Sequence, residues 1–373
     1  MTIYLDCNAT TPIDPAVAKL VRRYMEEEFG NSGSRTHAFG LRAKGAIEKA
    51  RQQVADVVDA QKDEVIFTSG ATESNNLAIL GLAAELKEKD KTHIVTTAIE
   101  HKAVLEPCAF LESQGFLVSY LAPDVNGAVT VEAVENAITD STGLVSVMHV
   151  NNETGVIQPI TGIADLLEGK SIYFHVDAAQ GFGKLLDPLS HPYIDLISVS
   201  GHKIYGPKGV GAIITRRRNY KRPPLAPLLF GGGQERGLRP GTLPVPLIAG
   251  FGLAAETLKN NNYWWAHCEI IKKQALAAFN AIGAHFHGEN TFPNVINLSI
   301  PGVNSEAAIV ALKGIVAISN GSACTSSSYT PSHVLKAMGM TDDEASECVR
   351  FSWSHMTPTV DWEDIAGRVR RLL

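Results

Sequence analysis

The sequence predicts an α/β protein with two domains, a large one built on a mostly parallel sheet and a smaller α+β one. Short, almost continuously apolar strands alternate with helical segments through most of the chain. A stretch rich in Pro and Gly at residues 223–252 interrupts this alternation, and a second α+β segment follows it. With 373 residues, 45% of them hydrophobic, the chain is long enough for two domains.

The first elements are marked by their boundary residues. Asp14-Pro15 is typical of a helix start, and apolar residues then recur at helical spacing until Gly30. A strand is predicted at 64–68, where β-branched and aromatic residues gather. Ser69-Gly70 ends this strand, and a helix is predicted at 75–87.

Further short strands follow along the chain. They are predicted at residues 93–97, 117–121, 143–150, 173–176, 195–199 and 210–214. Strands that are apolar along their whole length are typical of a parallel sheet with helices on both faces.

The character of the sequence changes in the Pro- and Gly-rich stretch. Helical periodicity returns after Phe251, and a strand at 295–300, a helix at 305–313 and a capping box at 341–344 come next. We therefore predict a large domain over residues 16–250 and a small domain formed by residues 1–15 together with 251–373.

The composition excludes several classes of protein. A formal net charge of −6 offers no general attraction to nucleic acid, so direct nucleic-acid binding is not expected. Five widely spaced cysteines without a CxxC pair indicate neither a disulfide framework nor a metal site. No secretory signal and no long apolar span is present, so we expect a cytoplasmic protein without membrane attachment. No GxGxxG follows an early strand, which disfavours a nicotinamide dehydrogenase.

The junction at residues 68–74 is a candidate anion site. A strand ends there, small residues turn and a helix begins, so backbone N–H groups and the helix dipole favour a phosphate. Thr72 adds a hydroxyl to this junction. Because many strand–turn–helix junctions look alike, a plain turn stays open as the alternative.

Two candidate catalytic residues follow successive strands. Asp177 ends an apolar strand, where it can either hold a pyridinium proton or cap the next turn. Lys203 lies one strand further on, in a dense turn of small residues. A partly desolvated lysine there has a lowered pKa and forms Schiff bases readily, whereas the alternative is an ordinary surface lysine. The neighbouring Ser200 and His202 can reach a phosphate.

Four further side chains suit catalysis, each with a structural alternative. His101 follows a strand and can stack on a planar cofactor and move protons, or be structural. Asn152 can bind a phenolic oxygen or a carboxylate, or shape a turn. Cys324 lies in a loop of small residues that suits a mobile nucleophile, or an unreactive thiol. Arg350 can clamp a substrate carboxylate or form a structural salt bridge.

In combination, these residues resemble the cysteine desulfurases of the NifS/IscS type, which belong to the class V aminotransferases. The resemblance implies a fold-type I pyridoxal 5′-phosphate enzyme, with Cys324 in a segment like that of the long-loop class. The matching motifs run nearly from end to end: 4–6 with 9–12, 30–31 with 34–37, 69–75, 100–101, 151–155, 177–180, 200–203, 231–242, 322–326 and Arg350.

The resemblance implies conversion of L-cysteine to L-alanine. Lys203 would carry the Schiff base, Asp177 would pair with the pyridine nitrogen, and His101 would stack on the ring and assist proton transfer. Cys324 would attack the substrate sulfur and hold it as a persulfide for an acceptor protein. A cysteine in that position could also ligate a transient iron–sulfur cluster, although no resident metal is expected.

The resemblance also implies the binding residues. Asn152 would contact the phenolic side of the ring and, with Arg350, hold the substrate carboxylate. Thr242 would reach the phosphate of the neighbouring subunit, which implies a homodimer. The remaining cofactor-binding residues would be Ala71, Thr72, Ser200 and His202 at the phosphate and Gln180 at the phenolic side.

The chain departs from the family pattern in ways that bear on its partner. Asn31-Ser32-Gly33 replaces a common Asn-Pro, and residues 351–356 lack a Gly-Arg-Phe-like ending. The chain stops at Leu373, where members that serve an iron–sulfur scaffold carry a longer tail. We therefore expect a dedicated sulfur acceptor, as in DNA phosphorothioation or tRNA thiolation. The alternatives are a selenocysteine lyase or another fold-type I enzyme, with no use for Cys324, and a non-catalytic scaffold.

Overall fold

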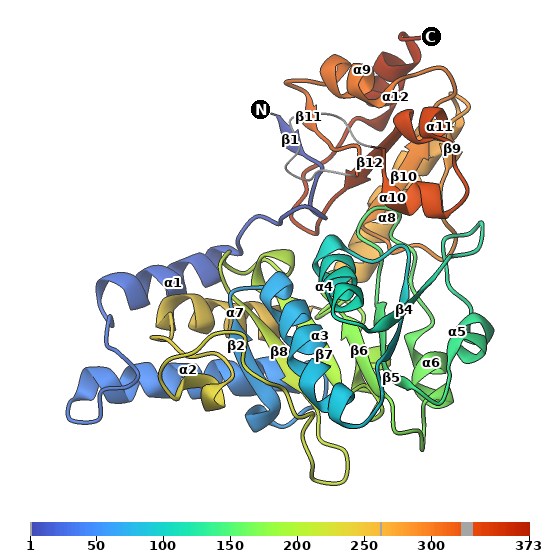
Figure 1. The fold of residues 1–373 in the computed structure, drawn as a ribbon. Coiled ribbons are helices and arrows are strands. Elements are labelled where there is room, and N and C mark those ends of the chain that lie inside the picture. Colours follow the sequence, from blue (N-terminus) through green and yellow to red (C-terminus); the bar gives the residue numbers. More distant parts are fainter. Residues whose placement is uncertain (1, 262, 322–330) are drawn as a thin grey trace.

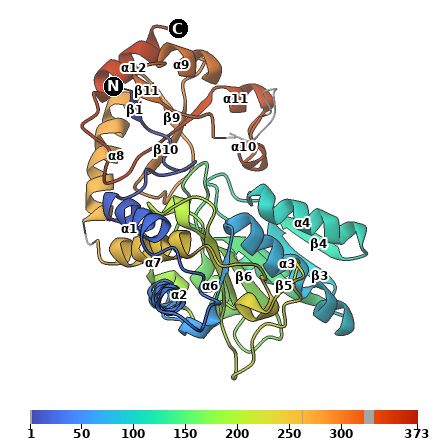
Figure 2. The same cartoon turned by 90° about the vertical axis from the view of Figure 1, so that its left-hand side faces the viewer.

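A computed structural model describes residues 2–261, 263–321 and 331–373 of the protein. The chain forms a larger lobe around a sheet and a smaller lobe that holds both termini (Figures 1 and 2). Among the described residues, none of the helices is both long and apolar enough to cross a membrane.

The larger lobe is built on a seven-stranded sheet. In spatial order its strands are β2 (Val65–Thr68), β8 (Gly211–Thr215), β7 (Leu196–Ser200), β6 (Tyr173–Asp177), β5 (Thr142–Met148), β3 (His93–Thr97) and β4 (Leu117–Leu121). From β7 to β4 all neighbours are parallel, and β8 is antiparallel to both β2 and β7. The predicted mostly parallel sheet is therefore confirmed.

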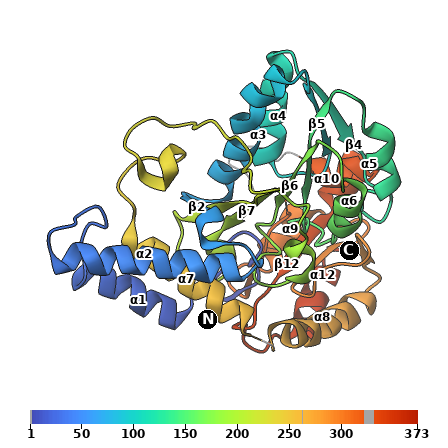
Figure 3. The ribbon, with the colours of Figure 1, turned by 90° about the horizontal axis from the view of Figure 1, so that it is seen from below.

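Helices cover both faces of this sheet (Figure 3). On one face, α3 (Ala71–Glu88) and α4 (Lys102–Ser113) bury a core that includes Leu82, Ile94 and Ile213. On the other face, a larger core includes residues of α2 (Ala38–Asp56), α6 (Ile160–Leu166) and α7 (Val245–Lys259). Burial on both faces explains why inner strands such as β5 and β7 have no exposed residue, whereas the edge strand β4 is partly exposed.

The remaining helices of the larger lobe are α1 and α5. α1 (Pro15–Glu26) packs against α7, and the Asp14 side chain caps it as predicted by accepting from Ala16 N at 2.7 Å. α1 ends at Glu26 and not at Gly30. α5 (Val131–Ala137) is capped by the hydroxyl of Thr130.

The smaller lobe is α+β. Its antiparallel sheet has the order β12 (Cys348–Ser352), β10 (Val295–Ser299) and β9 (His285–Phe286), and β1 (Ile3–Tyr4) pairs in parallel with β11 (Val316–Ala317). Its helices are α8 (Trp264–Asn280), α9 (Ser305–Ala311), α10 (His333–Ala337), α11 (Asp342–Ser346) and α12 (Trp362–Arg370). The predicted capping box is present, because the side chains of Thr341 and Glu344 each bond to the other's backbone N–H.

α7 begins inside the stretch that we predicted to be irregular. Pro246 lies in its first turn, where a missing N–H costs no intrahelical hydrogen bond, so this proline marks a helix start. The helix continues through residue 250 to Lys259 and packs on α1 and α2. The division at residue 250 stays a prediction.

Candidate active site

A cavity of about 800 Å³ opens at the carboxyl ends of the parallel strands. Met148, Asp177 and Ser200 are the last residues of β5, β6 and β7, and all three line it. The parallel topology therefore brings side chains from distant parts of the chain to one edge of the sheet. Arg350, on β12 of the smaller lobe, lines the same cavity.

The cavity brings together nearly all the residues that the sequence analysis selected. Those that line it are Ala71, Thr72, His101, Asn152, Asp177, Gln180, Ser200, His202, Lys203 and Arg350. Thr242 is exposed and does not line the cavity of its own chain. Cys324 lies outside the described residues, but Gly321 and Pro331, on either side of that segment, both line the cavity.

The turn between β2 and α3 forms one end of the cavity. Gly70 has a φ of 153°, and α3 starts directly after it, at Ala71. β8 passes very close beneath this turn, because a Cβ on Gly211 would lie 2.7 Å from the Gly70 Cα. The helix begins four residues earlier than predicted. Its first N–H groups lie at the cavity, where they favour an anion.

His202 lies at this end of the cavity as an uncharged ring. Burial is the main cause that lowers the pKa of His202 to about 4, with the nearby charge of Lys203 acting in the same direction. Its Nδ1 is 3.2 Å from the hydroxyl of Thr10. A neutral imidazole can donate a single N–H to an anion without adding a positive charge.

Asp177 is fixed in the floor of the cavity by two hydrogen bonds. Its Oδ1 accepts from the backbone N–H of Ala179 at 3.0 Å, and its Oδ2 accepts from Asn75 Nδ2 at 2.7 Å. Both Asp177 and Asn75 are buried. The carboxylate is thus held in one orientation, and Asn75 links it to the first turns of α3.

Lys203 presents an amine that is easily deprotonated. Burial, followed by the positive charges of Arg350 and Lys184, lowers the pKa of Lys203 to about 7. Its Nζ donates to the carbonyl oxygens of Asn8 and Ala9 on the N-terminal segment, the latter at 2.9 Å. A lysine with such a pKa is a nucleophile and a proton carrier at neutral pH.

His101 caps α4 in a defined tautomer. Its Nδ1 accepts from the backbone N–H of Ala103 at 3.1 Å, so the proton of the neutral ring lies on Nε2. Burial is the main cause that lowers the pKa of His101, while the charge of Asp177 opposes it. The shift favours the neutral ring, and an imidazole with its proton on Nε2 can donate or accept a proton at a neighbouring group.

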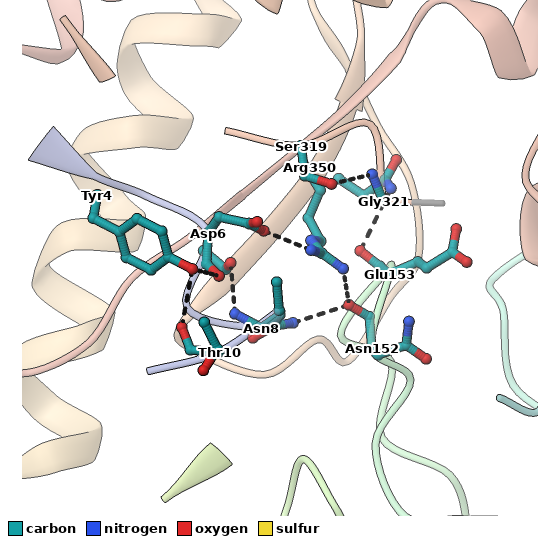
Figure 4. A network of polar contacts seen from close by, with 12 residues as sticks. Tyr4, Asp6, Asn8, Thr10, Asn152, Glu153, Ser319, Gly321 and Arg350 are labelled. Carbon is teal, nitrogen blue, oxygen red and sulfur yellow. Dashed lines mark hydrogen bonds and ion pairs between the residues drawn. The ribbon is translucent and has the colours of Figure 1, made fainter. Parts of the chain in front are cut away.

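Arg350 is held by both lobes, as Figure 4 shows. Its Nη2 donates to Asp6 Oδ1 at 2.6 Å, and its Nη1 donates to the carbonyl of Asn152 at 2.9 Å. Asn8 donates to the same Asn152 carbonyl and accepts from Gln180 Nε2 at 2.9 Å through its own carbonyl. The N-terminal segment therefore connects the arginine to the rest of the cavity wall.

The four described cysteines are unsuited to nucleophilic chemistry. Cys7, Cys108, Cys268 and Cys348 are buried and unpaired. Burial raises the pKa of each of these thiols to about 12, which keeps them protonated.

Glu100 is a buried carboxyl directly behind the cavity. Its Oε1 accepts from Thr97 Oγ1 and from Met148 N, both at 2.8 Å, and its buried Oε2 has no hydrogen-bond partner among the described residues. Burial raises the pKa of Glu100 to about 8, against its two hydrogen bonds. The group is therefore a neutral acid at pH 7.

This protonated carboxyl predicts a pH-dependent stability. Because the folded pKa is raised, the stabilising effect of the bound proton is complete below about pH 4.5 and is lost as the pH rises through about 8. The wild type should lose stability between pH 5 and 8, whereas Glu100→Gln lacks this titration. The unfolding free energy of Glu100→Gln relative to that of the wild type should therefore rise by about 2 kcal/mol or more over this range. Denaturant melts at pH 5, 7 and 9 measure this difference. Glu88→Gln, on the exposed end of α3, is the control, and a constant difference for Glu100→Gln would contradict the prediction.

Comparison with known proteins identifies the family of this site. The model of the aminotransferase class-V family matches residues 3–365. The chain belongs to this family. Pyridoxal 5′-phosphate is the cofactor of class-V aminotransferases, and the expected fold is confirmed by the sheet and by the solved structures of the family.

A curated relative and two solved structures resemble the chain over nearly its whole length. "Cysteine desulfurase IscS" of Rickettsia massiliae is 45% identical over 368 residues, covering 96% of this chain and 87% of the relative. A structure of DndA from Streptomyces lividans is 48% identical, with a TM-score of 0.82, and covers 94% of this chain and 99% of that one. A structure described as "SspA in complex with cysteine" is 39% identical, with a TM-score of 0.84, and covers 96% of this chain and 100% of that one.

The residues of the cavity fit the class-V cofactor. The N-terminus of α3 suits its phosphate, the fixed carboxylate of Asp177 suits its ring nitrogen, and Lys203 suits its aldehyde. When bound, the cofactor supplies an electron sink for the carbanion of an amino acid.

Three residues that the structure brings to the site had no role predicted from the sequence. Asn75 bonds to Asp177, Asp6 bonds to Arg350, and Glu100 lies buried beside His101. Each acts on another side chain, so neither hydrophobic periodicity nor motif spacing indicates its partner. Asp6, Asn75 and Glu100 do all lie in the motifs of the family resemblance, which was the available signal.

Proposed function

We propose that this protein is a pyridoxal 5′-phosphate-dependent cysteine desulfurase that converts L-cysteine to L-alanine and holds the sulfur as a persulfide on Cys324. The observation that carries the proposal is one cavity in which the near-neutral amine of Lys203 and the fixed carboxylate of Asp177 lie with Arg350. The names of the relatives, at 45% identity over most of the chain, support the same activity.

The described side chains bind the substrate, transfer protons and hold the cofactor. Arg350, with Asn152 beside it, binds the carboxylate of L-cysteine and so orients the amino acid. Lys203, whose amine loses its proton near pH 7, and His101, with its proton on Nε2, move protons at the substrate carbons. Ala71, Thr72, Ser200 and His202 hold the cofactor phosphate, and Gln180 contacts the phenolic side of its ring.

Cys324 takes the sulfur in this proposal. Its thiolate attacks the sulfur of the bound cysteine, the carbon–sulfur bond breaks, and the electron pair of that bond stays with the carbon that becomes the alanine methyl group. The flanking residues Gly321 and Pro331 line the cavity, which supports access of this segment to the substrate. The persulfide then goes to an acceptor protein, such as one that serves DNA phosphorothioation or tRNA thiolation.

A homodimer and a cytoplasmic location belong to the same proposal. Thr242 is exposed and lies outside its own cavity, as expected for a residue that reaches the phosphate of a partner subunit. In the same loop region Leu229 and Phe230 are 50% and 89% exposed, which suits burial against a second copy. The wide spacing of the cysteines favours a reducing compartment.

The test of the function is alanine release from L-cysteine by the purified protein, its Cys324→Ala variant and a Ser326→Ala control from the same segment. The expected result is a yellow protein that forms alanine only when Cys324 is intact. A trapped adduct with one added sulfur atom should likewise appear only when Cys324 is intact. Alanine formation that ignores Cys324 would favour a selenocysteine lyase or another enzyme of this fold. A colourless protein that stays inactive after cofactor is added would favour a scaffold.

A further inference from the structure

Arg350 lies in the cavity with one carboxylate already bound to it. The side chains of Arg350 and Asp6 are 3% and 18% exposed, and their Nη2 and Oδ1 atoms are 2.6 Å apart. The carbonyl of Asn152 takes Nη1, and the buried Nε has no hydrogen-bond partner among the described residues. The guanidinium is thus aimed by two acceptors and keeps N–H groups for a third.

Asp6 is itself held firmly in place. The hydroxyl of Tyr4 donates to the backbone carbonyl of Asp6 at 3.0 Å and to that of Thr10 at 3.1 Å (Figure 4). The chain on either side of Asp6 bonds to the strand that carries Arg350, through Ser352 N to Leu5 O at 2.8 Å and Cys7 N to Ser352 O at 3.0 Å. The backbone of Asp6 is therefore anchored beside the strand of Arg350, which keeps its side chain within reach of the guanidinium.

We propose that Asp6 is a positioning residue that sets the affinity of Arg350 for the substrate carboxylate. The proposal rests on the function given above, in which Arg350 binds that carboxylate. Asp6 acts in two opposing ways: its hydrogen bond aims the guanidinium, and its negative charge offsets the positive charge that attracts the substrate. Cysteine then binds against a fixed counter-ion, which keeps affinity for any carboxylate moderate.

The charge of Asp6 also affects the pKa of Lys203. Asp6 and Asp177 are the carboxylates that raise the pKa of Lys203, whereas Arg350 and Lys184 lower it. Loss of the Asp6 charge should therefore shift the pKa of Lys203 further down. A role limited to holding the fold would not produce this shift.

The experiment compares Asp6→Asn and Asp6→Ala with the wild-type holoenzyme. Asp6→Asn keeps an acceptor for Arg350 and removes the charge, whereas Asp6→Ala removes both. L-Alanine, the reaction product, is the carboxylate probe, and its affinity is measured by the thermal shift it causes and by inhibition of cysteine turnover. Asp14→Asn is the matched control, because it removes a charge from the same segment at a side chain that caps α1.

The expected result is an order of affinities. L-Alanine and L-cysteine should bind Asp6→Asn about fivefold or more tightly than wild type, with Asp6→Ala weaker than Asp6→Asn and Asp14→Asn equal to wild type. The change should appear in KM more than in kcat. Equal affinity in wild type and Asp6→Asn, or an equal loss in both Asp6 variants, would overturn the proposal.

Two further comparisons distinguish the Asp6 proposal from a folding defect and from a failure of the proposed function. Asp6→Glu keeps the charge but displaces it by one methylene, so it should lower L-alanine affinity about fivefold, and unchanged affinity there counts against the proposal even if Asp6→Asn does not fold. If the wild type makes no alanine but Asp6→Asn still binds L-alanine more tightly, only the function fails. If the wild type is active and Asp6→Asn binds like Asp14→Asn, only the Asp6 proposal fails.

Discussion

Lys203→Ala is expected to remove the visible absorbance of the bound cofactor and to lower alanine formation at least about 100-fold, the lower end of what one positioned acid–base group contributes. The reason is the amine itself. Burial beside Arg350 and Lys184 brings the pKa of Lys203 to about 7, so the wild type has a neutral amine available that no neighbouring lysine replaces in that position. The measurement combines an absorbance spectrum of the purified protein with a single-turnover assay of alanine.

Lys208→Ala is the matched comparison for this prediction. Lys208 also lines the cavity, but it is exposed to solvent, unlike Lys203. Its loss should change turnover less than about fivefold, as is usual for an exposed charge. A Lys203→Ala protein that kept its colour and more than a tenth of the wild-type rate would contradict the assignment.

Several strands of this fold were predictable because short runs rich in residues that favour strands mark them in the sequence. The predicted strands at 93–97 and 117–121 coincide with β3 and β4, and the strand at 173–176 lacks only Asp177 of β6. Each is a short run that contains β-branched or aromatic residues and is too short for a typical helix, which favours a strand.

The helices were harder, for reasons that differ from helix to helix. α2 was not predicted, because its buried face consists largely of Gly40 and of alanines such as Ala43 and Ala50, which give a weak hydrophobic period. α7 was predicted to begin later, because Pro246 reads as a breaker although it lies in the first turn. The two helices pack closely against each other through small residues, because a Cβ on Gly252 of α7 would lie 2.5 Å from the Ala50 Cα of α2.

The residues of the site also differ in how predictable they were: those at strand ends could be predicted, whereas those that act through another side chain could not. Asp177, Ser200 and Lys203 were predictable because strand ends of a parallel sheet converge, and the structure brings all three to one cavity. Asn75 and Asp6 were not, because a hydrogen bond between residues 102 or 344 positions apart has no local signature. Only the folded arrangement identifies such partners.

Asp177→Asn is expected to lower kcat/KM for L-cysteine by about 100-fold or more, with a smaller loss of cofactor affinity. The amide keeps the shape of the side chain and an oxygen that can still accept from Ala179 N, but it removes the negative charge from the cavity floor. A ring nitrogen facing that floor would lose the partner that holds its proton, and the cofactor would be a weaker electron sink. Tryptophan fluorescence during cofactor titration measures the affinity, and initial rates measure kcat/KM.

Asn75→Leu separates the charge of Asp177 from its orientation. Leucine fills the same buried space but cannot donate to Asp177 Oδ2, so the carboxylate keeps its charge and loses the 2.7 Å hydrogen bond. We expect a loss of about tenfold in kcat/KM, and less than additive losses when Asn75→Leu and Asp177→Asn are combined, because both act on one interaction. Asn76→Leu, whose amide bonds to the Thr72 carbonyl instead, is the comparison on the same helix. Strictly additive effects of the pair would mean that Asn75 does not act through Asp177, and the carboxylate would then owe its orientation to Ala179 alone.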